Sequence, residues 1–170
     1  MIHLSALSRD DFHLVANIRV DADQVKFAGT VAEAFEADEA GVDFHGIFRD
    51  ETAWGFFKID RDYAARFDFC PAGELGLRAF IVDRARQGQG IGTAAVRALP
   101  DYLPRLYPQA PSIALTVNLI NPAARAAYLK GGFVDTGEIY PHGDAGPQNI
   151  LRMPLQRAPE PAVVDLGTEG

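Results

Sequence analysis

A glycine-rich segment near the middle of the chain constrains its fold more than any other feature. The segment RQGQGIGTAA (86–95) follows ELGLRAFIV (74–82), whose composition predicts a buried strand, and leads into small helix-forming residues. Glycine allows backbone conformations that other residues avoid and lets a ligand approach the main chain closely. The first N–H groups of a helix that follows such a turn are free to bind an anion. The sequence therefore predicts a strand, a turn and a helix arranged around a phosphate.

Three known glycine patterns compete for this segment. A P-loop ends in Gly-Lys-Ser/Thr, whereas here Gly92 is followed by Thr93 without a lysine. A Rossmann turn, G-x-G-x-x-G/A, fits residues 90–95, but it requires an acidic residue about 20 positions later, and the next strand runs ALTV into Asn118. The third pattern, Q/R-x-x-G-x-G/A, fits residues 87–92 directly.

Together with a second segment downstream, this pattern resembles the GNAT superfamily of N-acetyltransferases. VNLINPAARAAYLKGGFVDTGE (117–138) is similar to the family's Asn…Ala…Tyr-x-x-x-Gly-Phe segment, and LRAFIVD (77–83) looks like the family's fourth strand. The two blocks have the expected order and separation and cover residues 74–138. DADQVKFAGTVAEAF (21–35) loosely resembles the acidic N-terminal segment of bacterial polyamine acetyltransferase-like members.

The resemblance implies acetyl-CoA as co-substrate and assigns residues to it. The pyrophosphate would bind the N–H groups of Gln87, Gly88, Gln89, Gly90, Ile91, Gly92 and Thr93. The pantetheine arm would pair with the strand edge formed by Phe80, Ile81 and Val82, and one N–H group there would polarise the thioester. Asn121 would lie near the arm, and Arg125 on the same helix would reach phosphate or adenosine. Arg86, or another arginine nearby, would add a charge-assisted contact to phosphate.

The resemblance also implies the catalytic groups. Tyr128, the tyrosine of the second block, would protonate the leaving thiolate. The alternative is a core tyrosine whose hydroxyl is satisfied within the protein. Asn121 followed by Pro122 could likewise be a plain helix cap.

The base that deprotonates the amine is harder to assign. Many family members carry a glutamate on the fourth strand, and Glu74 is the candidate, although it lies at the start of the strand. The central positions hold Gly76 and Arg78 instead. A solvated strand end is the alternative reading of Glu74. A water relay or one of the acidic residues Glu33, Glu36 and Asp38 could serve in its place.

The elements predicted along the chain indicate an α/β fold with a mixed sheet. The resemblance implies a mostly antiparallel, twisted sheet of six to seven strands flanked by helices. Strands are expected at 2–4, 44–49, 52–60, 74–82, 113–117, 133–139 and 149–155. Helices are expected at about 8–20, 30–39, from 90 onward and 122–130, and loops at 21–29 and 61–73. Because proline interrupts a helix, Pro100 and Pro104 predict a bend or restart near Leu99.

Composition limits the organisation and the partners. The 170 residues fit one domain, expected at 1–157, and APEPAVVDLGTEG (158–170) predicts a mobile acidic tail. A net charge of −7 argues against nucleic acid and is compatible with solubility or a cationic substrate. Neither a signal peptide nor a membrane span is expected, and the single cysteine, Cys70, favours the cytoplasm. No metal site is expected.

The resemblance thus implies an acetyl-CoA-dependent N-acetyltransferase acting on a primary amine of a small molecule, with a polyamine as the most specific candidate. A protein or peptide amino group is the alternative acceptor. A non-catalytic acyl-CoA-binding sensor is the alternative from another class of function. Fold does not fix these choices, and the oligomeric state also stays open, with a homodimer as one option.

Overall fold

One seven-stranded sheet organises the chain in the computed structural model, which describes residues 1–155. The strands are β1 (His3–Leu7), β2 (Val42–Arg49), β3 (Thr52–Asp60), β4 (Leu75–Val82), β5 (Ser112–Asn118), β6 (Val134–Tyr140) and β7 (Gln148–Pro154). Their order across the sheet is β1-β2-β3-β4-β5-β7-β6, and only β4 and β5 pair in parallel. The predicted mixed, mostly antiparallel sheet is confirmed, with seven strands.

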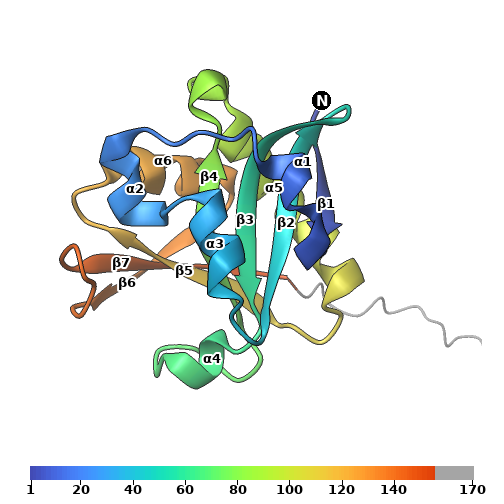
Figure 1. Cartoon of the computed structure of the whole chain (residues 1–170). Coiled ribbons are helices and arrows are strands. Elements are labelled where there is room, and N and C mark those ends of the chain that lie inside the picture. The colour runs from blue at the N-terminus through green and yellow to red at the C-terminus, as the bar shows by residue number, and fades with distance from the viewer. Residues whose placement is uncertain (156–170) are drawn as a thin grey trace, which may run out of the picture.

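Helices cover both faces of this sheet (Figure 1). They are α1 (Phe12–Val15), α2 (Ala22–Ala28), α3 (Val31–Ala37), α4 (Tyr63–Arg66), α5 (Ile91–Leu106) and α6 (Pro122–Gly131), with short 3-10 helices at Arg9–Asp11 and Arg84–Arg86. Helices α1 and α3 pack on one face, and α5 and α6 pack on the other. No helix of the described residues is long and apolar enough to cross a lipid bilayer.

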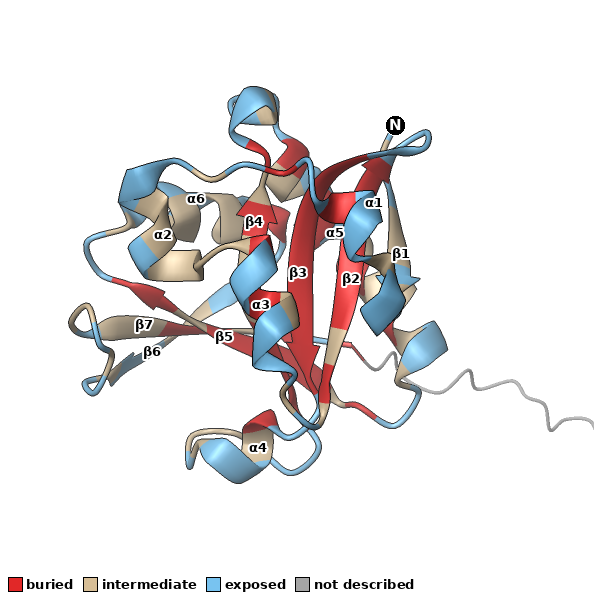
Figure 2. Ribbon diagram, in the orientation of Figure 1, coloured by how far each residue is buried: buried red, intermediate tan, exposed pale blue. Residues whose placement is uncertain are grey.

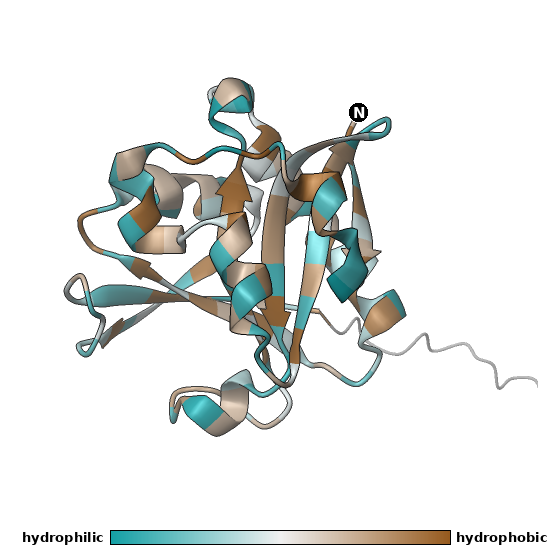
Figure 3. Cartoon of the chain, viewed as in Figure 1, coloured by the Kyte–Doolittle hydropathy of each residue, from teal (hydrophilic) through white to brown (hydrophobic). Residues whose placement is uncertain are grey.

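Each face of the sheet has its own apolar core because side chains alternate along the strands. On β3, Phe57 and Ile59 face α5, whereas Phe56 faces α1 and α3. The central strands are buried almost throughout (Figure 2), and hydrophobic residues are concentrated along them (Figure 3). This two-sided burial explains why β3 and β4 have near-continuous apolar sequences.

The sheet opens between β4 and β5. The two strands pair only at Leu75 with Ile113 and at Gly76 with Ala114. Beyond these pairs β4 runs on to Val82 and β5 to Asn118, and the two strands diverge (Figure 1).

An irregularity in β4 lies beside this opening. Ala79 has a φ of 51°, and the register with β3 shifts between Phe56 and Lys58. A bulge of this kind bends its strand and redirects its side chains. A positive φ is uncommon for a residue with a Cβ, so the surrounding structure must hold this conformation in place.

Several local predictions differ from the structure. The segment 21–29, expected as a loop, contains α2, and the first predicted helix ends at Val15 rather than near Val20. The fifth helix does not restart at Leu99, because it is continuous from Ile91 to Leu106 and contains both prolines. Complete burial of Leu99 and Leu103 offsets the backbone bonds that the prolines remove. The predicted tail, 158–170, lies outside the described residues.

Candidate functional site

The divergence of β4 from β5 creates a cleft of about 620 Å³. Its walls are the second half of β4, the end of β5, one face of α6, helix α2 and the loop between β6 and β7. A volume of this size suits a small-molecule ligand. Its lining includes apolar and aromatic side chains of β4, β5 and α6, among them Phe80, Leu115 and Tyr128. It also includes a charged set, Glu39, Lys58, Arg66 and Arg78, which we call the charged end of the cleft.

The glycine turn lies at the start of α5, beyond the end of β4. Gly88 has a φ of 81° and Gly90 a φ of 77°, and a Cβ added at either position would meet nothing within 4 Å. Both glycines are therefore required by backbone conformation and leave open space above the turn. Gly90 is the N-cap of α5 and supplies no side-chain cap. The N–H groups of the first turn, from Ile91 to Thr93, thus remain free to bind an anion.

The end of β4 adjoins this turn. The Gln87 side chain donates a hydrogen bond from Nε2 to the Val82 carbonyl at 3.1 Å, which ties the turn to the strand. A Cβ on Gly92 would lie 3.6 Å from Phe80 and 3.7 Å from Val82. On the side away from β3, this part of β4 has no strand partner, because β5 has already diverged. Ile81 is buried in the opposite core, so only the backbone of that residue is available to a ligand.

Tyr128 lies on α6 and lines the cleft. Its ring makes edge contacts with Phe80 and Phe133, at centroid separations of 5.7 and 5.8 Å. Its hydroxyl has no hydrogen-bond partner among residues 1–155, which speaks against a satisfied core tyrosine. Burial raises the pKa of Tyr128. The phenol therefore stays protonated at neutral pH and can donate a proton.

The other two predicted residues on α6 have different surroundings. Asn121 is the N-cap of the helix, yet its side chain makes no capping hydrogen bond and lines the cleft. Arg125 does not line the cleft. Its guanidinium binds Asp135 on β6 at 2.6 Å, so this residue ties α6 to the edge of the sheet. The expected contact of Arg125 with phosphate or adenosine stays a prediction.

Glu74 is not at the site. Its side chain is fully buried, accepts a hydrogen bond from Ser112 Oγ at 2.7 Å, and pairs with Arg152 at 2.6 Å. It precedes Leu75, at the end of β4 where β4 and β5 are still paired, and it does not line the cleft. Both readings of Glu74 from the sequence, a base and a solvated strand end, are wrong. The residue is half of an internal ion pair.

The alternative acidic residues of the N-terminal half are also elsewhere. Glu33 forms a capping box with Thr30, and Asp38 pairs with Arg9 at 3.3 Å. Glu36 is exposed on α3. The cleft is lined instead by Glu39, which was not predicted from the sequence.

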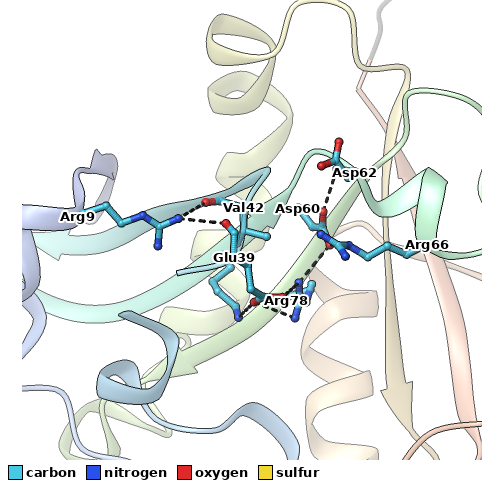
Figure 4. Close-up of polar contacts among 8 residues, drawn as sticks. Arg9, Glu39, Val42, Asp60, Asp62, Arg66 and Arg78 are labelled. Atoms are coloured by element: carbon cyan, nitrogen blue, oxygen red, sulfur yellow. Dashed lines mark hydrogen bonds and ion pairs between the residues drawn. The ribbon is translucent and has the colours of Figure 1, made fainter. Parts of the chain in front are cut away.

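Glu39 belongs to a network of charged residues at the charged end of the cleft (Figure 4). Lys58 Nζ lies 2.9 Å from Glu39 Oε1, and the Arg78 guanidinium donates to both oxygens of Glu39. Burial alone would raise the pKa of Glu39, but the hydrogen bonds from Lys58 and Arg78 outweigh it and hold that pKa below its ordinary value. Glu39 is consequently a poor general base.

The same network continues to a buried carboxylate. Asp60 is completely buried and accepts hydrogen bonds from Arg78 at 3.2 Å, from Arg66 at 2.8 Å and from the Asp62 N–H at 2.9 Å. Arg9 donates to the carbonyls of Glu39 and Val42 and so fixes the loop that presents Glu39. The one signal in the sequence was Arg78 at the centre of β4, where a carboxylate was expected.

Asn118 is a further residue of the cleft that the sequence did not single out. It ends β5, and its Oδ1 accepts the Ile120 N–H at 3.0 Å. This bond fixes the side-chain amide. Its Nδ2 is buried without a partner among the described residues, which is uncommon for a buried donor.

Comparisons with known proteins agree with this geometry. The family model described as "Acetyltransferase (GNAT) family" matches residues 9–133. A curated relative, the uncharacterized N-acetyltransferase YbbJ of Bacillus subtilis (strain 168), is 29% identical over 93 residues. That alignment spans 54% of this chain and 58% of the relative's length.

Solved structures share the fold. Aminoglycoside acetyltransferase AAC(6')-Ib, in complex with coenzyme A and kanamycin, superposes with a TM-score of 0.73 at 19% identity, covering 91% of this chain and 95% of that one. A chimera of spermidine N-acetyltransferase SpeG from Vibrio cholerae and hSSAT superposes with a TM-score of 0.65 at 18% identity, covering 91% and 95%.

Proposed function

The chain belongs to the acetyltransferase (GNAT) family, and from this premise we propose that it transfers an acetyl group from acetyl-CoA to the primary amine of a small molecule. The observation that carries the proposal is the cleft between β4 and β5, which has a free strand edge on one side and Tyr128 on the other. The glycine turn at the end of β4 adds an anion site in line with that edge.

The residues of the cleft fit acetyl-CoA. The open space above Gly88 and Gly90 would admit the pyrophosphate against the N–H groups at the start of α5. The unpaired edge of β4 supplies alternating donors and acceptors to the amides of the pantetheine arm. Asn121 adds a side-chain amide that is not used for capping. When bound, acetyl-CoA supplies the activated acetyl group.

Tyr128 and β4 would then perform complementary tasks. A backbone N–H group of β4, near the bulge at Ala79, would stabilise the negative charge that develops on the thioester oxygen. Tyr128 would give its proton to the departing thiolate, because the phenol lines the cleft and is protonated at neutral pH. The amine must be neutral to attack, and no carboxylate of the network is a competent base. We propose that water removes the proton from an amine whose pKa is lowered by the surrounding cations.

A direct assay tests this proposal. Release of free thiol from acetyl-CoA is followed with a panel of amines that includes amino acids, spermidine, aminoglycosides and short peptides. Turnover of one or more small amines is the expected result. A preference for peptides would favour the alternative acceptor, a protein or peptide amino group.

The variant Tyr128→Phe separates an enzyme from a sensor. It removes only the hydroxyl, so kcat should fall by roughly 100-fold while the affinity for acetyl-CoA stays within about twofold. Tyr140→Phe, a hydroxyl deletion in the same cleft, is the matched control and should change kcat far less. Acetyl-CoA binding without turnover of any amine would refute the enzyme and favour the sensor.

A further inference from the structure

We propose that the acceptor carries a carboxylate in addition to its reactive amine, and that the cations at the charged end of the cleft bind this carboxylate. The inference rests on the proposed acetyl transfer and names its substrate class. It follows from the sign of the charge in the cleft, from the pairing of the carboxylates there, and from hydrogen-bond donors that remain available.

The charge of the cleft is opposite in sign to the charge of the whole chain. The sequence carries a net charge of −7. Among the residues that line the cleft, four are cationic and only two are carboxylates. The cations are Lys26, Lys58, Arg66 and Arg78, and the carboxylates are Glu39 and Asp144. A ligand in the cleft therefore meets an excess of positive charge in a chain that is otherwise acidic.

The carboxylates that could hold a cationic substrate are already occupied. Glu39 accepts one hydrogen bond from Lys58 and two from Arg78. Asp60, which lies behind the cleft lining, is fully buried and accepts from both Arg66 and Arg78. Asp144, in the loop between β6 and β7, is the only carboxylate of the cleft lining that has no ion pair within residues 1–155. A polyamine, with several ammonium groups, would thus find one free carboxylate.

Two of these cations have N–H donors without a hydrogen-bond partner among the described residues. Within residues 1–155, Arg66 binds Asp60 through Nε alone, and its side chain is 41% exposed and lines the cleft. Its two terminal nitrogens are thus free to bind a carboxylate in the bidentate geometry that guanidinium favours. Lys58 is 7% exposed and has three donors, yet Glu39 is its one partner in the described structure. Arg66 and Lys58 are therefore the two candidates for binding an acceptor carboxylate.

Aromatic side chains line the cleft together with Arg66 and suggest a suitable probe. Phe67 and Tyr140 meet edge to face at a centroid distance of 5.3 Å, and Tyr140 contacts His142 in the same way at 5.5 Å. All three line the cleft together with Arg66. An acceptor with an aromatic body and a carboxylate would fill this end, so phenylalanine is a useful model compound.

Two matched series of acceptors test the proposal at saturating acetyl-CoA. The first compares L-phenylalanine with L-phenylalaninamide, and the second compares 4-aminobutanoate, butylamine and 1,4-diaminobutane. In each series that shows turnover, the acceptor with a carboxylate, L-phenylalanine or 4-aminobutanoate, should have the highest kcat/KM, by roughly tenfold or more. The amine of the amide is the weaker base and more of it is neutral, so intrinsic reactivity works against this result. A higher kcat/KM for an acceptor without a carboxylate, namely L-phenylalaninamide, butylamine or 1,4-diaminobutane, would overturn the proposal.

Variants connect the preference to the cations. Arg66→Gln should raise KM for the carboxylate acceptor by roughly tenfold and leave KM for acetyl-CoA unchanged, and Arg66→Lys should restore part of the loss. Lys26 is exposed and has no ion pair among the described residues, so Lys26→Glu tests the same sign of charge without disturbing the fold. Arg105→Glu, on the exposed surface of α5, is the control and should leave the preference intact.

The outcomes separate this inference from the proposed function. If spermidine or an aminoglycoside is acetylated and neither carboxylate acceptor is, the acetyltransferase stands and the carboxylate proposal fails. If the preference for carboxylate survives in both Arg66→Gln and Lys26→Glu, the assignment to these cations fails. If no amine of any class is acetylated, the proposed function itself fails.

Discussion

The two ends of the cleft differ in whether backbone groups or side chains form them. The end proposed for the cofactor consists mainly of backbone, namely the glycine turn and the free edge of β4. The end proposed for the acceptor consists of charged side chains from four separate segments, with Glu39, Lys58, Arg66 and Arg78 each on a different one. A backbone site depends on local conformation, whereas a side-chain site depends on which segments the fold brings together. The backbone site therefore tolerates few changes of conformation without losing its ligand. The side-chain site can change its specificity through single substitutions.

The largest predicted effect tests whether Glu74 belongs to either end. Glu74→Gln leaves Arg152 without its buried partner and should lower the free energy of unfolding by about 3 kcal/mol, at the low end for buried pairs because Arg152 keeps some exposure. The folded protein should keep its kcat, because Glu74 lies outside the cleft. Chemical denaturation and initial rates measure the two quantities. Glu36→Gln, at an exposed site, is the control, and a large loss of kcat with little loss of stability would restore Glu74 as a base.

The next prediction addresses the backbone end. Gly90→Val forces a β-branched residue into a φ of 77° and places a side chain in the open space above the turn. KM for acetyl-CoA should rise by roughly 50-fold or more, because the backbone must shift and the anion site is obstructed. Gly137→Val is the control, since Gly137 has a φ of 84° and equally open surroundings on β6, away from the cleft. Equal effects of both variants on KM would mean that strain alone, and not the anion site, is responsible.

This contrast also explains what could be predicted from the sequence. The backbone end was predictable because its residues are contiguous, and Gly88 and Gly90 indicate their own conformation. The acceptor end was not, because Glu39 and Arg78 are far apart in sequence and meet only when β3 pairs both with β2, which Glu39 precedes, and with β4, which carries Arg78. Glu74 was misassigned because its partner, Arg152, lies on β7, and β7 reaches it only through the order of strands in the folded sheet. Continuous α5 was missed because burial of Leu99 outweighs a local proline signal.

A third prediction concerns a buried group outside both ends. His45 is stacked on Phe57, and its two ring nitrogens lie 2.6 Å from the Tyr102 hydroxyl and 3.0 Å from the Tyr107 hydroxyl. Tyr107 donates its own proton to Asp43 at 2.6 Å, so Nε2 of a neutral His45 must donate to Tyr107. Burial lowers the pKa of His45 to about 4, and Asp43 opposes this only in part.

The sign of the resulting pH dependence is defined. The unfolded chain binds a proton at this histidine below a pKa of about 6.5, whereas the folded chain does so only near 4, so acid favours the unfolded state in that interval. Stability should fall by about 2 kcal/mol between pH 7 and pH 5 from this group. Denaturation of the wild type and of His45→Gln at both pH values measures the difference. An unchanged pH dependence in the variant would contradict the assignment.

The smallest predicted effect separates helix capping from ligand binding in one residue. Asn121 is the N-cap of α6, but its side chain makes no capping bond and lines the cleft. Asn121→Ala should therefore change the free energy of unfolding by less than about 0.5 kcal/mol while weakening acetyl-CoA binding by roughly three- to tenfold, the worth of one hydrogen bond. Thr30→Ala is the opposite case, because the Thr30 hydroxyl accepts the Glu33 N–H and caps α3 outside the cleft. That variant should lose about 1 kcal/mol of stability and no affinity. Calorimetric titration measures the affinity of both variants for acetyl-CoA, and thermal unfolding measures their stability. A loss of stability without a loss of affinity in Asn121→Ala would show that Asn121 caps the helix and does not bind the ligand.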